Sequence, residues 1–130
     1  MEKYLKLHLY YATAAIVLLI SIAFVSLMPL TGLPKTEFDH IDKIVHLLIY
    51  FILSLVIAKG FFNLEKTPLS IKAIPIGLSF FYSFFIEILQ SLLTNYRFFE
   101  IFDILANGIG CLIALAVINT RFFNNKTITK

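Results

Sequence analysis

Residues 80–107 read FFYSFFIEILQSLLTNYRFFEIFDILAN, and this segment decides how the chain folds. It places Glu87 in the middle of an apolar run, and Asp103 and Asn107 follow a short polar turn. A charge at membrane depth costs roughly 2.5–3.5 kcal/mol on insertion scales. A carboxyl group in such a run must therefore be protonated, paired or lining a polar cavity. We read the rest of the chain for the groups it brings to Glu87.

The composition is that of a membrane protein. Of the 130 residues, 59% are hydrophobic and 15% are charged, whereas soluble domains carry about 45–50% apolar and about 25% charged residues. The mean hydropathy is +0.88. The length fits a single domain covering residues 1–130. One cysteine, Cys111, excludes a disulfide framework within the chain.

Four hydrophobic segments are long enough to cross a bilayer, which takes about 20 apolar residues. Residues 7–34 contain no Asp, Glu, Lys or Arg. A signal peptide is the competing interpretation, but this run exceeds an h-region of about 7–15 residues and no clean Ala-x-Ala site follows it. We therefore expect an all-α, integral membrane four-helix bundle. Its helices are expected at about residues 9–28, 41–62, 71–93 and 100–120.

Lysine and arginine residues are unequally divided between the two sides of this expected bundle. The N-terminus, the second loop and the tail hold eight of them, and the first and third loops hold three. Loops rich in Lys and Arg stay in the cytoplasm by the positive-inside rule. We therefore expect both termini to be cytoplasmic. The formal net charge of +3 then reflects membrane topology rather than nucleic-acid binding.

Polar side chains of the last three expected helices recur three or four residues apart, which places them on shared helix faces. At 1.5 Å per residue, Glu87 lies roughly 10 Å below the outer end of its helix, and Asn107 lies about as deep. We expect these faces to form a polar cavity open toward the outer surface. The candidate residues are Asp42, Lys43, His46, Tyr50, Glu87, Gln90, Arg97, Asp103 and Asn107.

Several of these residues also have structural explanations. Gly110 and Ala114 follow the small-xxx-small spacing that lets two membrane helices approach closely. Asn107 would serve equally well as an interhelical hydrogen-bonding group. Glu87 is harder to explain as a purely structural residue. Glutamine would make the same contacts at a lower free-energy cost of burial. Asp42, His46, Glu87 and Asp103 could supply oxygen and nitrogen ligands to a metal ion. Since the chain contains no HExxH motif or close pair of histidines, we predict neither a metal nor a cofactor.

The order of these motifs resembles the VanZ-like family. The resemblance covers Ile41 to Ala114 and rests on four motifs: Asp42-Lys43-x-x-His46-x-x-x-Tyr50, Glu87-x-x-Gln90, Arg97, and Asp103-x-x-x-Asn107-x-x-Gly110. The family often has glycine where this chain has Ala114, a departure that affects packing more than polar chemistry. Its members are small bacterial membrane proteins, and its founder is associated with teicoplanin resistance. The resemblance implies a multi-pass protein of the bacterial cytoplasmic membrane with a role in the cell envelope.

Four functions compete at this stage. The first is binding of a lipid headgroup, a lipid-linked envelope precursor or an amphiphilic glycopeptide such as teicoplanin, with Lys43 and Arg97 binding phosphate. The second is a structural subunit that assembles with itself or with a larger membrane partner. The third is an intramembrane enzyme acting on lipid-linked phosphates, with Glu87 or His46 as acid or base. Proton-coupled transport ranks last, because no second acid continues the path below Glu87.

Overall fold

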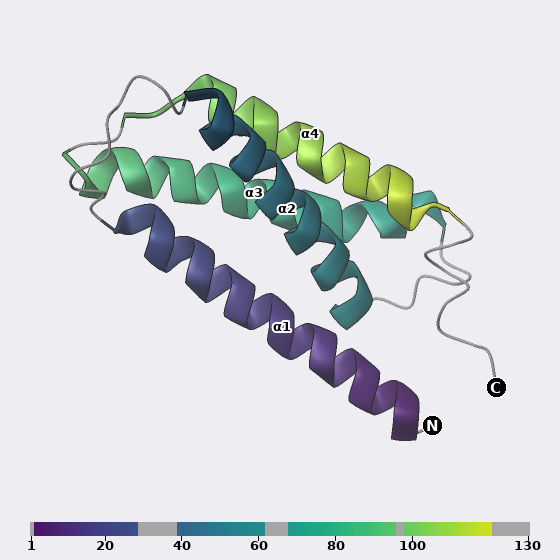
Figure 1. The fold of residues 1–130 in the computed structure, drawn as a ribbon. Helices are drawn as coiled ribbons and strands as arrows, with labels where there is room; N and C mark the ends of the chain where they lie inside the picture. Colours follow the sequence, from purple (N-terminus) through teal and green to yellow (C-terminus); the bar gives the residue numbers. More distant parts are fainter. Residues whose placement is uncertain (1, 29–38, 62–67, 96–97, 121–130) are drawn as a thin grey trace.

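The computed structural model describes residues 2–28, 39–61, 68–95 and 98–120, and four α-helices make up most of these ranges (Figure 1). They are α1 (Glu2–Leu27), α2 (Asp39–Phe61), α3 (Leu69–Leu93) and α4 (Ile101–Ile118). Each helix contains a segment long and apolar enough to cross a membrane. The prediction of an all-α fold with four helices able to span a membrane is confirmed for the described residues.

The helix bounds differ from the expected ones mainly in α1, which begins at Glu2 rather than near residue 9. The apolar span covers only Leu5–Leu27, so the helix continues into the polar N-terminal segment. There Lys6 Nζ lies 2.6 Å from Glu2 Oε1, one turn earlier in the helix. An exposed i,i+4 ion pair of this kind stabilises a helix slightly. At the other end of the chain α4 ends at Ile118 rather than near residue 120.

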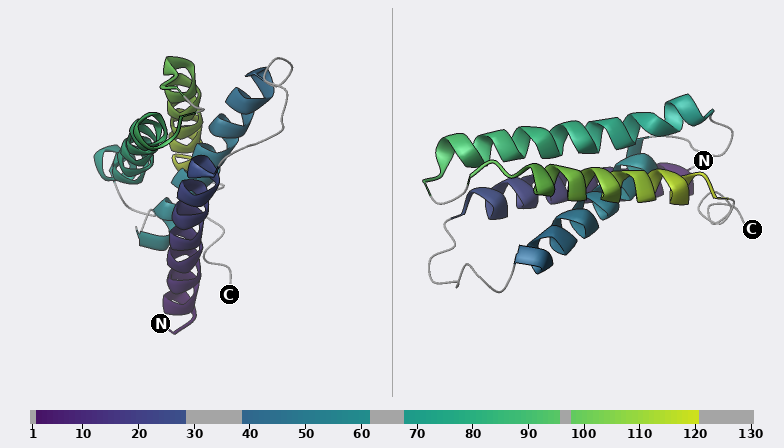
Figure 2. Two further views of the ribbon diagram at one scale, coloured as in Figure 1. Left: turned by 90° about the vertical axis from the view of Figure 1, so that its left-hand side faces the viewer. Right: turned by 90° about the horizontal axis from the view of Figure 1, so that it is seen from above.

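The helices run alternately up and down, and α2 crosses the middle of the bundle (Figures 1 and 2). It packs most extensively on α4 and on α1, and it also contacts α3. The starts of α2 and α4 and the ends of α1 and α3 lie at one end of the bundle. We call this end the polar end.

Buried and exposed side chains are distributed as a lipid-facing protein requires. Ser54, Ser79 and Ser83 are fully buried between helices, whereas large apolar side chains such as Phe81 and Leu92 point outward. Water would disfavour this arrangement, but hydrocarbon favours it, because polar groups in a bilayer find their partners inside the protein. The apolar core lies beneath the polar end, around Leu53 of α2.

Two side chains of α3 attach α1 to the rest of the bundle through its backbone. Tyr82 Oη donates to the Leu19 carbonyl at 2.5 Å, and Gln90 Nε2 donates to the Ser26 carbonyl at 3.0 Å. Below these points α1 diverges from α3 (Figure 1), and an apolar hollow of about 630 Å³ lies between α1, α2 and α3. Helix α1 is the least buried of the four helices.

Close approach of α2 and α4 depends on Gly110. A Cβ at this position would collide with the Leu47 carbonyl group and lie 3.2 Å from Leu47 Cα. Ala114, one turn further along α4, is also fully buried. The small residues of α4 therefore set how near its polar face comes to that of α2.

Gly110→Ala should destabilise the protein, because either the methyl group or the α2 backbone must move. Overpacking of this kind costs about 1–3 kcal/mol. Gly77→Ala is the matched control, since a Cβ there would meet no atom within 4 Å, and alanine favours helix by up to about 1 kcal/mol. Thermal unfolding of both variants in the same detergent measures the difference. Equal stability of the two would contradict the packing role of Gly110.

Candidate functional site

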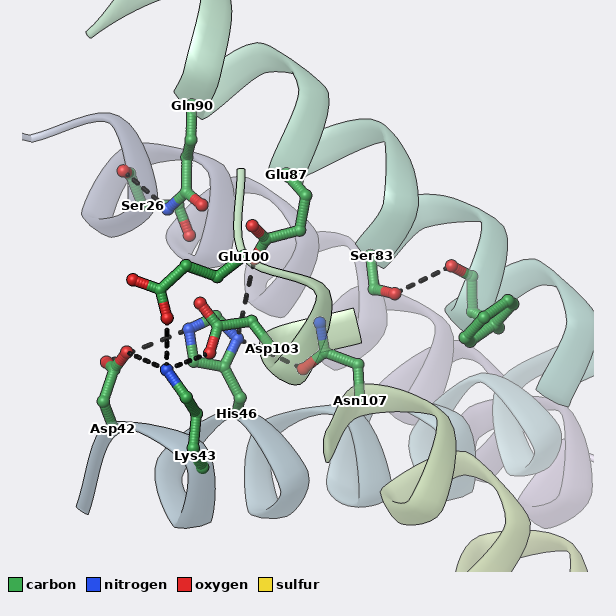
Figure 3. Close-up of polar contacts among 11 residues, drawn as sticks. Ser26, Asp42, Lys43, His46, Ser83, Glu87, Gln90, Glu100, Asp103 and Asn107 are labelled. Carbon is green, nitrogen blue, oxygen red and sulfur yellow. Dashed lines mark hydrogen bonds and ion pairs between the residues drawn. The ribbon is translucent and has the colours of Figure 1, made fainter. Parts of the chain in front are cut away.

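Side chains from α2, α3 and α4 converge at the polar end (Figure 3). Helix α2 contributes Asp42, Lys43 and His46, one turn or less apart. Helix α3 contributes Glu87, which is 1% exposed, and α4 contributes Asp103 and Asn107. Together with Glu100, just before α4, these seven residues form what we call the polar cluster: Asp42, Lys43, His46, Glu87, Glu100, Asp103 and Asn107.

Lys43 makes the shortest contacts of the polar cluster. Its Nζ lies 2.6 Å from Glu100 Oε2 and 2.7 Å from Asp103 Oδ1, and it lies 4.0 Å from Asp42 Oδ2. The two short contacts have the length of charge-assisted hydrogen bonds. They cross from α2 to the start of α4, so Lys43 fixes these two helix ends against each other.

His46 lies between an outer and an inner carboxyl group. Its Nδ1 is 3.1 Å from Asn107 Oδ1 and 3.9 Å from Glu87 Oε1, while its Nε2 is 3.9 Å from Asp42 Oδ1. An amide oxygen only accepts hydrogen bonds. The contact with Asn107 therefore requires a proton on Nδ1, which in the neutral ring leaves the lone pair of Nε2 facing Asp42.

Asn107 brings an unsatisfied donor to the centre of the polar cluster. The residue is fully buried, and its Nδ2 has no hydrogen-bond partner among the described residues. A buried donor left without an acceptor costs about 1–3 kcal/mol. The fold thus retains an NH₂ group beside His46 and near Glu87 at some expense in stability.

The other sequence-predicted residues lie apart from these contacts or outside the described ranges. Gln90 turns toward α1 and binds the Ser26 carbonyl. Tyr50 is buried in the apolar core. Arg97 lies outside the described residues. Glu100 was not predicted, although it stands three residues before Asp103, a spacing that would place both carboxyl groups on one side of α4.

Carboxyl groups outnumber basic groups in the polar cluster, so it is suited to cations and to hydrogen-bond donors. Lys43 is already shared by two carboxylates, which weakens the expectation that it binds phosphate. One ligand atom each from Asp42, His46 and Asp103 lies within 4.8 Å of the others, a grouping able to hold a metal ion. The sequence offers all three among its candidate residues but shows no metal-binding spacing, because Asp103 is distant in the chain from the other two.

Comparison with known proteins assigns the chain to a family. The model of the VanZ/LLP1 family matches residues 4–123, which is nearly the whole chain. The chain belongs to the VanZ/LLP1 family. The match includes α2, α3, α4 and nearly all of α1. The polar cluster of this VanZ/LLP1 protein therefore lies within the residues matched by the family model.

A curated relative from fission yeast is similar to this VanZ/LLP1 protein. Uncharacterized protein C11E3.10 of Schizosaccharomyces pombe is 35% identical over 100 residues, which are 77% of this chain and 57% of the yeast protein. The chain thus spans a little more than half of that relative. A eukaryotic relative shows that sequence similarity alone does not assign the chain to bacteria. No solved structure matches the chain.

Lys43→Met should lower the thermal unfolding midpoint. Methionine keeps the apolar stem but leaves Asp103, which is nearly buried, without its counter-ion. Loss of a hydrogen-bonded charge partner costs about 1–3 kcal/mol. The double variant Lys43→Met/Asp103→Asn should regain much of this loss, because the unmatched carboxylate is gone. Lys6→Met, at an exposed pair, is the control. A Lys43→Met protein as stable as the wild type would contradict the clamping role of Lys43.

Proposed function

We propose that the polar cluster binds the headgroup of a lipid or of a lipid-linked molecule from the outer side of the membrane. The observation that carries this proposal is the unsatisfied Asn107 Nδ2, fully buried beside His46 and near Glu87. A ligand that supplies an acceptor to this NH₂ group would recover the cost of leaving it unmatched.

Hydroxyl groups fit this site better than phosphate. A hydroxyl accepts a hydrogen bond from an amide and donates one to a carboxylate, and the inner part of the polar cluster offers Asn107 Nδ2 and the Glu87 carboxyl group. An anionic phosphate would instead meet Asp42 and Asp103, with Lys43 already engaged by two carboxylates. The preferred ligands are therefore glycolipid headgroups, sugar-bearing envelope precursors or amphiphilic glycopeptides of the teicoplanin type.

Burial of the site decides how a ligand would enter. Glu100 and Asp42 form the more exposed side of the cluster, with 49% and 40% of their side chains accessible, whereas the Glu87 side chain is 2% accessible. A headgroup would approach past Asp42 and displace one of the Lys43 contacts. The apolar part of the ligand would remain in the bilayer alongside the outward-facing side chains.

Asn107→Leu tests this proposal by removing the unmatched donor. Native mass spectrometry of the protein from mild detergent should show retained lipid on the wild type and much less on this variant. Glu87→Gln should lose lipid as well, because a neutral amide accepts more weakly than a carboxylate. Leu112→Ala, on the exposed side of the same helix as Asn107, is the control. Wild-type protein that carries no lipid, or variants that carry as much as the control, would overturn the proposal.

A structural role is the second candidate, and the Lys43 contacts between α2 and α4 favour it. The two functions differ in what Glu87→Gln does to stability. A headgroup site keeps its carboxylate at a cost to the fold, so this variant should be as stable as the wild type or more stable. A purely structural network should lose stability on the same change.

The proposed ligand side requires the polar end to face outward, with both termini in the cytoplasm. In a bacterial host, green fluorescent protein fused after Lys130 should fluoresce, and alkaline phosphatase at the same point should stay inactive. Phosphatase inserted after Lys35 should be active, because α1 ends and α2 begins at the polar end. The reverse pattern would place the polar cluster in the cytoplasmic half and exclude an outward-facing ligand.

A further inference from the structure

We propose that Asp42, His46 and Asp103 form a binding site for a divalent transition-metal ion such as Zn²⁺. One ligand atom from each lies within 4.8 Å of the other two. Two of the three side chains are largely buried, at 12% exposure for His46 and 9% for Asp103. The metal site shares residues with the proposed headgroup site but does not depend on a headgroup being bound.

The hydrogen bond that His46 makes through Nδ1 supports a metal ligand at Nε2. The contact from Nδ1 to Asn107 Oδ1, at 3.1 Å, requires the proton to be on Nδ1. Metal-ligating histidines almost always donate their other ring N–H in this way, which orients the ring and fixes the tautomer. Asn107 therefore acts as a positioning residue, holding the Nε2 lone pair toward the outer carboxylates.

When His46 is neutral, this arrangement leaves electron pairs facing one another. In the neutral ring Nε2 is an acceptor, and it faces Asp42 Oδ1 at 3.9 Å with no proton of its own to donate. A cation between the two groups relieves the repulsion. Zn²⁺ fits the donor set, because it binds imidazole nitrogen and carboxylate oxygen at about 2.0–2.2 Å. Small side-chain rotations would bring the three groups to this distance.

Lys43 is the group that a metal ion must displace. Its ammonium lies 2.7 Å from Asp103 Oδ1, so it competes for one of the proposed ligands. Lys43 also has Glu100 at 2.6 Å, and it keeps that counter-ion when Asp103 turns to the metal. Three protein ligands leave at least one coordination position open, as in zinc sites that bind a water or a ligand oxygen.

Metal binding by the lipid-free, tag-free chain in detergent tests the proposal. After treatment with a chelator, the wild type should take up one Zn²⁺ per chain in equilibrium dialysis. Asp42→Asn should weaken binding at least tenfold, and it is the safest variant for folding because its contacts are the longest in the cluster. Asn107→Leu should weaken it by about 10–100-fold, the usual effect of losing a group that orients a ligating histidine. His8→Gln, on α1, should bind as the wild type does.

Two further measurements test which residues bind the metal ion. Lys43→Met should bind Zn²⁺ more tightly than the wild type, and the ion should restore its thermal stability, because the competing ammonium is absent. The absorption spectrum of bound Co²⁺ should change in Asp103→Asn and stay unchanged in His8→Gln. Absence of saturable uptake by the wild type, or equal affinity in Asp42→Asn and His8→Gln, would overturn the metal site. Because no lipid is added, that failure would leave the headgroup proposal to its own test.

Discussion

The two short contacts of Lys43 with Asp103 and Glu100 hold the polar end of the bundle together. Asp103 is largely buried, so its counter-ion must come from a neighbouring helix. Lys43 supplies it from α2, which already crosses the middle of the bundle. This ammonium group thus helps to fix the start of α4 against α2, and with it the position of Asn107 relative to His46.

Packing and polarity reinforce each other along α4. Gly110 lets α4 approach Leu47 of α2 so closely that a methyl group would not fit. The same approach brings Asn107 Oδ1 within 3.1 Å of His46 Nδ1. A looser helix pair would lengthen this hydrogen bond and release the imidazole ring. The small residues of α4 therefore influence the orientation of His46 through the distance between the α2 and α4 backbones.

Most of the fold could be predicted from the sequence, because helix length and the spacing of polar residues are local properties. The same periodicity identified Glu87 and Asn107 as neighbours across helices, and the structure brings them into one cluster. Side-chain pairing is not local. Lys43 was expected to meet a phosphate, yet it is occupied by carboxylates of α4 and the residues before it. The contact of Gln90 with a carbonyl of α1 could not be predicted, since every residue carries that group.

The attachment of α1 through carbonyl oxygens has a consequence for how this helix tolerates mutation. Tyr82 and Gln90 recognise the main chain at Leu19 and Ser26, not their side chains. Most changes of residue type along α1 leave both hydrogen bonds intact, whereas an insertion or deletion would rotate the two carbonyls away from their donors. The attachment of α1 therefore constrains its register rather than the residue types on its outer surface.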